Sequence, residues 1–328
     1  MNMLEPCIRK LGVLLGLLCV ILSPLLYAAP AQAGWRTYVS RSGTYNNYCD
    51  ITSPCLSFDV ALSHTEDGGQ ITCLDQGSFG GNGNQVTITQ SVTIDCNGVD
   101  AWTTGDQSTL TETDLLVINA PGKVVHLRNL DISGVLPEIG LNGIVIQAAA
   151  AVNIENCTIK NFAQNGISDR RSSGGQLTIS NTVLSNNGAS GSGGIDIVPS
   201  SGATIQVVIN HSEIKGNNFG IGADGRQGGI IRATVRDSVI SGNIANGVSA
   251  ISSGASVAFL LDQTDVTGNA VGLYASGSGA GMAARNTGVF NNTIGLEAVN
   301  GGKLLTAGNN NVIGNPTEGA FTGSAGQQ

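Results

Sequence analysis

The sequence predicts an all-β fold, a right-handed parallel β-helix in which short strands wind into stacked coils. Three copies of one six-residue phrase occur at a constant spacing of 26 residues, at Ser212–Asn217, Ser238–Asn243 and Thr264–Asn269. Such a period is typical of a solenoid, in which each repeat buries its apolar face only against its neighbours. Three short strands fit into each repeat of roughly 25 residues, which is the arrangement of a parallel β-helix.

Residues 1–33 have the pattern of a signal peptide. Arg9-Lys10 precedes an apolar run from Leu11 to Leu26, and Ala31-Gln32-Ala33 is a small-residue cleavage pattern. A membrane anchor needs about 20 apolar residues, whereas this run is shorter and is interrupted by Ser23-Pro24. We therefore expect a secreted or periplasmic protein with no membrane span after cleavage.

Composition and charge favour a packed, acidic β protein. Of the 328 residues, 41% are hydrophobic and 12% are charged, which differs from the low hydrophobicity and high charge of disordered chains. Without residues 1–33 the chain has 13 Lys and Arg against 22 Asp and Glu, a net charge of −9, so nucleic acid is an unfavourable partner. The continuous repeat predicts one β-helix domain over 69–328, preceded by an N-terminal cap over 34–68.

A short helix is expected ahead of the first coil. Ser53-Pro54 provides an N-cap and a proline at the first helical position, and the helix should end by Gly68-Gly69. A strand is expected before it, at Trp35–Val39. The apolar residues of the helix fall on one face: Phe58, Ala61 and Leu62. We expect this face to cover the open apolar end of the stack, because solenoids need caps for solubility.

Five cysteines follow residue 33: Cys49, Cys55, Cys73, Cys96 and Cys157. Ile71-Thr72-Cys73 recurs 23 residues later as Ile94-Asp95-Cys96. Cys73 and Cys96 should therefore lie one above the other at the strand spacing of about 4.8 Å, which suits a disulfide. Cys49 and Cys55 should then pair across the cap loop. Cys157 occupies a hydroxyl position of the repeat, so we interpret it as a buried structural thiol.

Three columns of residues follow from the repeat. One is apolar: Ile132, Ile159, Leu184, Ile214, Ile240, Val266, Val289 and Ile313. Two positions earlier stands a column of small residues, expected to face inward: Cys157, Thr182, Ser212, Ser238, Thr264 and Thr287. The third holds asparagines: Asn187, Asn217, Asn243, Asn269 and Asn292 at three residues after the apolar centre, and Asn161 and Asn315 at two. Asparagine tolerates left-handed turns and can stack its amides, which favours a structural role over a polar binding ribbon.

Two stretches, Pro54–Leu62 and Gly68–Gly77, resemble the beginning of proteins of the pectate-lyase-like superfamily, where a helix leads into Gly-Gly, a strand and an Asp-x-Gly turn. The later repeats resemble those of the same group, most of all secreted bacterial β-helix proteins with paired N-terminal cysteines and no assigned activity. The resemblance implies a parallel β-helix in a carbohydrate context. The Gly-His-Gly segment of the hydrolases and the Asp-Pro-His segment of the epimerases do not occur in this sequence, and one fold hosts many chemistries.

A candidate site follows from the register of one strand per coil. The second and fourth residues after its opening glycine should face outward, which places Arg170, Asp196 and Asp224 on three successive coils. Asp196 and Asp224 would lie roughly 8 Å apart. Such a pair can act as acid and base on a glycosidic bond, or hold calcium beside a basic residue. Tyr274 is expected on the same face as a glycan contact. The alternative is a solvated surface on which one arginine balances two aspartates.

Two functions remain open. The first is a secreted protein that binds polysaccharide or a cell-surface glycan, or serves as a surface or interaction protein without catalysis. An aromatic content of 4% favours it, since sugar-binding clefts present aromatic rings. The second is a lyase or glycoside hydrolase of an acidic polysaccharide that uses the Arg170, Asp196 and Asp224 face, with calcium as its candidate cofactor.

Overall fold

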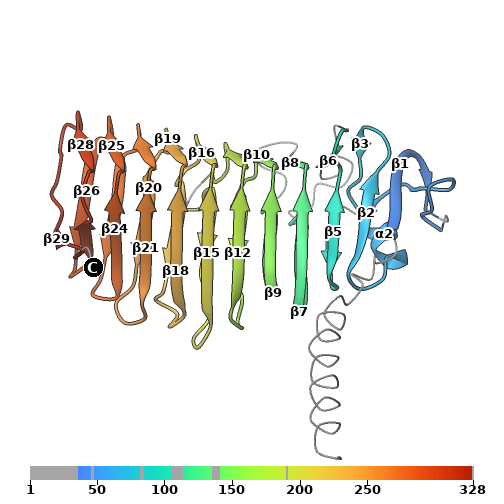
Figure 1. Cartoon of the computed structure of the whole chain (residues 1–328), viewed down its shortest axis with the longest axis horizontal. Coiled ribbons are helices and arrows are strands. Elements are labelled where there is room, and N and C mark those ends of the chain that lie inside the picture. Colours follow the sequence, from blue (N-terminus) through green and yellow to red (C-terminus); the bar gives the residue numbers. More distant parts are fainter. Residues whose placement is uncertain are drawn as a thin grey trace, which may run out of the picture. The chain divides into compact units, whose positions relative to one another are not determined.

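Parallel strands stack into coils along one axis (Figure 1). The computed structural model describes residues 36–45, 48–81, 85–99, 101–104, 114–134, 141–189 and 191–326. The predicted signal peptide and Trp35 lie outside these ranges, and residues 34–328 form one compact unit. The predicted right-handed parallel β-helix is confirmed.

Each regular coil adds one strand to a 10-stranded sheet, named here the short sheet, and two strands to a 19-stranded sheet. The two rows of strands in the 19-stranded sheet are named the middle and long sheets, and the chain visits short, middle and long in that order. The short sheet contains β3 (Gly77–Ser78), β6 (Ala101–Thr104), β8 (Asp131–Ser133), β10 (Thr158–Lys160), β13 (Val183–Ser185), β16 (Glu213–Lys215), β19 (Val239–Ser241), β22 (Asp265–Thr267), β25 (Gly288–Phe290) and β28 (Asn311–Ile313). The middle sheet contains β4 (Val86–Ile88), β11 (Ile167–Asp169), β14 (Ile195–Ile197), β17 (Ile221–Asp224), β20 (Asn246–Ile251), β23 (Val271–Ser276) and β26 (Ile294–Val299).

The long sheet begins near the N-terminus and runs the length of the solenoid. It contains β1 (Arg36–Thr44), β2 (Gly69–Cys73), β5 (Val92–Asp95), β12 (Gly175–Ser180), β15 (Thr204–Asn210), β18 (Ile230–Arg236), β21 (Val257–Asp262), β24 (Ala280–Arg285), β27 (Lys303–Thr306) and β29 (Gly323–Ser324). Two longer strands bend from the middle sheet into the long sheet: β7 (Leu116–Arg128) and β9 (Ile144–Glu155). None of the helices among the described residues has the length and apolar character needed to span a bilayer.

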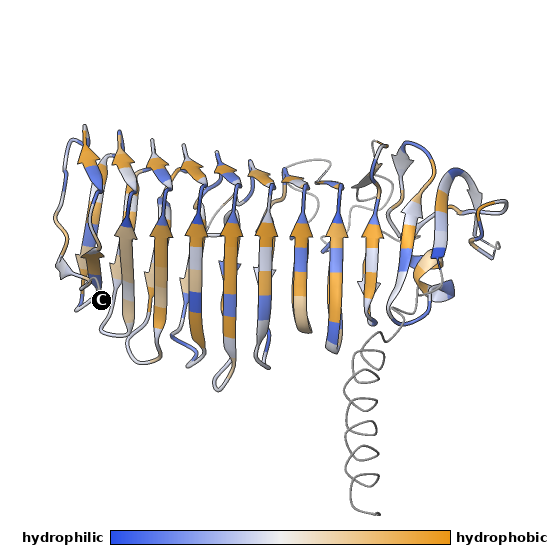
Figure 2. Cartoon of the chain, viewed as in Figure 1, coloured by the Kyte–Doolittle hydropathy of each residue, from blue (hydrophilic) through white to orange (hydrophobic). Residues whose placement is uncertain are grey.

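Apolar side chains fill the interior because successive residues of a strand point to opposite faces. The strands of the long sheet accordingly alternate between hydrophobic and hydrophilic residues (Figure 2). The predicted apolar column of the short sheet is in register and fully buried from Ile132 to Val289. The prediction is wrong for the last member of the column, Ile313. Val289 pairs with Val312 in its place, and Ile313 is 59% exposed. A slip of one residue in the assumed register moves a side chain to the other face.

The column of small residues is buried, as predicted: Cys157, Thr182, Ser212, Ser238, Thr264 and Thr287. Its hydroxyl groups connect the coils, because the backbone N–H of Cys157 donates to Thr182 Oγ1 at 3.3 Å and that of Thr182 donates to Ser212 Oγ at 3.3 Å. Cys157 is a free, buried thiol. Burial raises its pKa to about 12, so it stays protonated at neutral pH.

An asparagine ladder runs along the turns between the short and middle sheets: Asn187, Asn217, Asn243, Asn269, Asn292 and Asn315. In each step the backbone N–H and the side-chain amide of one asparagine donate to Oδ1 of the asparagine on the next coil. Asn315 ends the ladder by donating to Glu318 Oε2 at 2.9 Å. Asn161 is not a member, because Phe162 occupies the ladder position and its N–H donates to Asn187 Oδ1.

The left-handed conformation predicted for the ladder asparagines belongs to the residues before them: Asn161, Asn186, Gly216, Gly242, Gly268, Asn291 and Gly314. A second left-handed column forms the turns from the long to the short sheet: Asn129, Asn156, Asn181, His211, Asp237, Gln263, Asn286 and Asn309. The ladder asparagines therefore act through their amide hydrogen bonds and not through an unusual backbone conformation.

The N-terminal helix α2 (Phe58–His64) covers the first coils beside β1, β2 and β4 (Figure 1). Its three predicted apolar residues are buried, and Phe58 contacts Phe79 with ring centroids 5.7 Å apart. It starts four residues later than predicted, with Ser57 and not Ser53 as the N-cap. The cause is that Pro54 and Cys55 lie extended beside β1, where the N–H of Thr44 donates to the Pro54 carbonyl at 3.3 Å.

Both predicted disulfides are present, Cys73–Cys96 with a Cα–Cα distance of 4.8 Å and Cys49–Cys55 with 4.7 Å. Ile71 pairs with Ile94, which is the register on which the first prediction rests. The division between cap and β-helix at residue 69 stays a prediction, since β1 already pairs with β2 of the long sheet.

Candidate functional site

The outward face of the middle sheet carries the residues predicted as a site. Backbone pairing aligns one row along the solenoid: Val117, Val145, Ser168, Asp196, Gly222, Ser249, Tyr274 and Glu297. Arg170 and Asp224 lie two residues beyond this row on the coils either side of Asp196. The structure thus places Arg170, Asp196 and Asp224 on three successive coils of one face, and Tyr274 three coils beyond Asp196.

Arg170 and Asp196 form an ion pair on this face. Arg170 Nη2 lies 3.4 Å from Asp196 Oδ2, and Arg170 Nε donates to Ser168 Oγ at 2.8 Å. The arginine side chain is 52% exposed and the aspartate side chain 19%. Burial raises the pKa of Asp196; Arg170 opposes this effect and the charge of Asp224 adds to it.

Asp224 has its own arginine, which the sequence reasoning missed. Arg226 Nη2 donates to Asp224 Oδ2 at 2.6 Å, and Arg226 Nε lies within 3.0 Å of both carboxylate oxygens. Burial raises the pKa of Asp224, but these hydrogen bonds outweigh it and the pKa is lowered. Arg226 was overlooked because it follows β17 in a turn. The signal was the local sequence Asp224-Gly225-Arg226, in which a turn can fold the arginine back onto the carboxylate.

The donor set on this face does not fit a calcium ion. Calcium takes six to eight oxygen ligands, whereas the predicted site offers the two carboxylates of Asp196 and Asp224, and each is engaged by an arginine. No group of three or more metal-ligating side chains occurs in the described part of the chain. The arrangement instead presents two neutralised carboxylates and a half-exposed guanidinium.

An aromatic ring also lies on this face. A Cβ atom at Gly222 would come within 3.0 Å of the Phe219 ring, and one at Gly193 within 2.6 Å. Because Gly222 pairs with Asp196, the ring lies beside the Arg170–Asp196 pair. Glycine at an outward strand position was the signal for it, since glycine in a strand often marks a close approach. Two serines of the outward row, Ser168 and Ser249, are only 0% and 6% exposed, so neighbouring side chains cover part of this face.

No family model matches this sequence, and no curated protein matches it. Solved structures do match. A pectate lyase superposes with a TM-score of 0.50 at 14% identity, over 83% of this chain and 67% of that one. An alginate lyase from a Paenibacillus species superposes with a TM-score of 0.56 at 17% identity, over 89% of this chain and 98% of that one. The fold is a pectate-lyase-like β-helix. At these identities the likeness shows the fold alone.

A buried ion pair lies directly under the candidate site of this pectate-lyase-like β-helix. Asp169 and Arg171 flank Arg170 in sequence and point inward, and both side chains are 0% exposed. Arg171 Nη2 donates to Asp169 Oδ2 at 2.6 Å and Nε to Oδ1 at 2.9 Å. The remaining Nη1 donates to the carbonyls of Ala149 and Gln176. The pair fixes the turn from which Arg170 points outward.

Replacing Asp196 by asparagine is expected to remove a pH-dependent loss of stability. Because burial raises the pKa of Asp196 above 3.8, the folded protein holds this proton more tightly than the unfolded chain. The contribution of Asp196 to the free energy of unfolding is therefore greatest below pH 3.8, and it falls as the pH rises through the raised pKa. From acidic to neutral pH, the melting temperature of Asp196→Asn should therefore rise relative to that of the wild type. Glu297→Gln, in the same row, is the control, and parallel curves for all three proteins would contradict the prediction.

Proposed function

We propose that this protein is a secreted β-helix protein that binds an acidic polysaccharide along the outward face of the middle sheet. The observation that carries the proposal is Arg170, a half-exposed guanidinium held by Ser168 and Asp196. A guanidinium suits the carboxylate of a uronate sugar, because it can donate two parallel hydrogen bonds to it. The two disulfides agree with an oxidising, extracytoplasmic location.

The geometry of the face suits a linear polymer. Its outward residues recur once per coil at about 4.8 Å, which is close to the length of one sugar in an extended chain. Phe219 lies beside the Arg170–Asp196 pair and Tyr274 three coils further on, so rings are available for sugar stacking at two points. Since Arg226 and Arg170 each neutralise an aspartate, the face repels a uronate less than the net charge of the chain suggests.

Arg170→Ala is expected to weaken binding of polygalacturonate or alginate roughly tenfold or more, because it removes a charge-assisted contact. Isothermal titration of the mature protein, with calcium and with a chelator, measures the affinity. Arg232→Ala removes the same charge from an exposed position of the long sheet and should leave the affinity within about twofold at constant salt. Equal losses in the two variants would indicate nonspecific charge attraction and would sink the proposal.

A lyase activity on an acidic polysaccharide is the second candidate function. It is favoured by the raised pKa of Asp196 beside a guanidinium, because a raised pKa makes the carboxylate a stronger base for the C5 proton of a uronate while the arginine neutralises the uronate carboxylate. Ultraviolet absorbance of unsaturated sugar ends would detect this activity, and reducing ends without that absorbance would indicate hydrolysis. Turnover that survives Asp196→Asn would exclude this site as its centre.

A further inference from the structure

A polar pocket lies at the turn from the long to the short sheet, away from the middle sheet face. Its volume is about 850 Å³, within the range of small-molecule sites. It spans successive coils around β8 and β10. Its polar lining residues are Gln76, Asn97, Asn129, Asp131, Asn156 and Thr158.

Hydrogen bonds between coils hold one wall of this pocket in place. Asp95 Oδ1 accepts from the backbone N–H of Asn97 at 3.0 Å and from Asn129 Nδ2 at 2.6 Å. Asn129 Oδ1 in turn accepts from Asn156 Nδ2 at 2.6 Å. The two lining asparagines at left-handed turn positions are thus fixed relative to each other before any ligand binds. A pre-organised wall lowers the entropic cost of binding.

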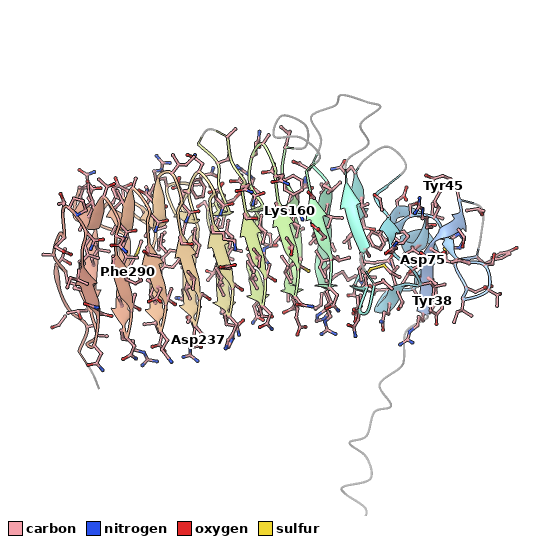
Figure 3. The ribbon with its side chains drawn as sticks, turned by 90° about the horizontal axis from the view of Figure 1, so that it is seen from above. Tyr38, Tyr45, Asp75, Lys160, Asp237 and Phe290 are labelled. Atoms are coloured by element: carbon pink, nitrogen blue, oxygen red, sulfur yellow. A yellow bond between two sulfur atoms is a disulfide. The ribbon has the colours of Figure 1, made fainter. Side chains whose placement is uncertain are left out.

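Next to these asparagines, the lining adds a carboxylate and a hydroxyl. Asp131 and Thr158 are paired residues on β8 and β10, with both side chains outward. Asp131 Oδ2 accepts from Lys160 Nζ at 2.7 Å, and Lys160 lies along the middle of the row of coils, between Tyr38 and Phe290 (Figure 3). Oδ1 of Asp131 is shielded and without a hydrogen-bond partner. Rotation about the soft terminal torsion of aspartate presents this acceptor to a ligand.

Most polar side-chain groups that line the pocket form no hydrogen bond within the described part of the chain. The side-chain amides of Gln76 and Asn97 and the hydroxyl of Thr158 make no hydrogen bond to any other described residue, although they line the pocket. Donors and acceptors are mixed among them. A ligand with many hydroxyl groups satisfies such a lining, because each hydroxyl both donates and accepts.

We infer that this pocket binds a neutral sugar or a short neutral oligosaccharide. The charge of the lining favours a neutral sugar over an acidic one, because Lys160 engages the Asp131 carboxylate and the described lining residues include no lysine or arginine that could pair with a uronate. A uronate would find no free positive charge there, whereas a neutral hydroxyl can donate to Asp131. The inference is independent of the polysaccharide face, since the two sites share no residue.

The test is titration of the full mature protein with neutral hexoses, pentoses and their disaccharides, and with an oligouronate. Thr158→Val, which keeps the shape and the Asp131–Lys160 pair, is expected to weaken neutral sugar binding roughly fivefold. Asp131→Asn should weaken it roughly tenfold or more, because a charge-assisted hydrogen bond is lost. Asp265 occupies the same register position on β22, so Asp265→Asn is the matched control and should have no effect.

The inference is overturned if no neutral sugar binds at millimolar concentration, or if Thr158→Val and Asp131→Asn both bind like the wild type. It is also overturned if the oligouronate binds and is lost in these variants. Arg170→Ala should keep the neutral sugar affinity, so a failure of the acidic polysaccharide proposal would remain distinguishable from a failure here.

Discussion

Replacing Asp169 by leucine alone is expected to lower the free energy of unfolding by about 3 to 5 kcal/mol. The reason is the complete burial of Asp169 and Arg171, whose side chains are 0% exposed. Without Asp169, the guanidinium keeps its hydrogen bonds to the carbonyls of Ala149 and Gln176 but loses its counter-charge. An unpaired charge in a low-dielectric interior is strongly unfavourable. Chemical denaturation of the mature protein measures the change.

Two further variants make this prediction specific. Asp169→Leu with Arg171→Met should recover most of the loss, because replacing both members of a buried pair by apolar residues is often neutral. The exposed pair Glu213–Lys215 has the same two-residue spacing, so Glu213→Leu should cost less than about 1 kcal/mol. If the double variant is as unstable as Asp169→Leu, or if Glu213→Leu costs as much, the buried charge is not the cause.

Asn243→Leu is expected to lower the free energy of unfolding by about 2 to 4 kcal/mol. Asn243 is 2% exposed, and its Oδ1 accepts from the backbone N–H and the side chain of Asn217 at 3.0 and 3.2 Å. Its own amide donates to Asn269 Oδ1 at 2.8 Å. Leucine removes these three bonds and the donation from Asn243 Nδ2 to the Ile214 carbonyl at 3.4 Å. It also leaves two buried donors of Asn217 unpaired, which costs more than the bonds contribute.

The melting temperature of Asn243→Leu, compared with that of a surface variant, measures this effect. Gln206→Leu places the same side chain on an exposed position of β15 and should change the stability by less than about 0.5 kcal/mol. An unchanged melting temperature in Asn243→Leu would show that the ladder contributes nothing to stability.

The register between coils could be predicted wherever the repeated phrases of the sequence recur at a regular spacing. Counting from the glycine that opens each strand placed Asp196 and Tyr274 in one row, and the 23-residue recurrence of Ile71–Cys73 placed Cys73 against Cys96; both placements are confirmed. The prediction was wrong at Ile313 because the last coil offers no following repeat to fix its phase.

The chemistry of the candidate site was less predictable, because it depends on side chains whose positions do not follow the repeat pattern. Asp169 occupies an inward position that is apolar in the next two coils, Ile197 and Ala223, so its pairing with Arg171 breaks the pattern. Arg226 and Phe219 lie in turns, where strand alternation gives no direction.

The asparagine ladder also makes a single coil exchangeable. The hydrogen bonds that join the coils of Asn217 and Asn243 are repeated between the coils of Asn243 and Asn269. In both cases the backbone N–H and the side-chain amide of the first asparagine donate to Oδ1 of the second. Deleting residues 238–263 would bring Asn217 against Asn269 and restore the same junction, whereas deleting any other length there would set amides against apolar residues. The length of this solenoid can therefore change in whole coils. Each coil gained or lost would lengthen or shorten the outward face of the middle sheet by one strand, and with it the stretch of polymer that the face can accommodate.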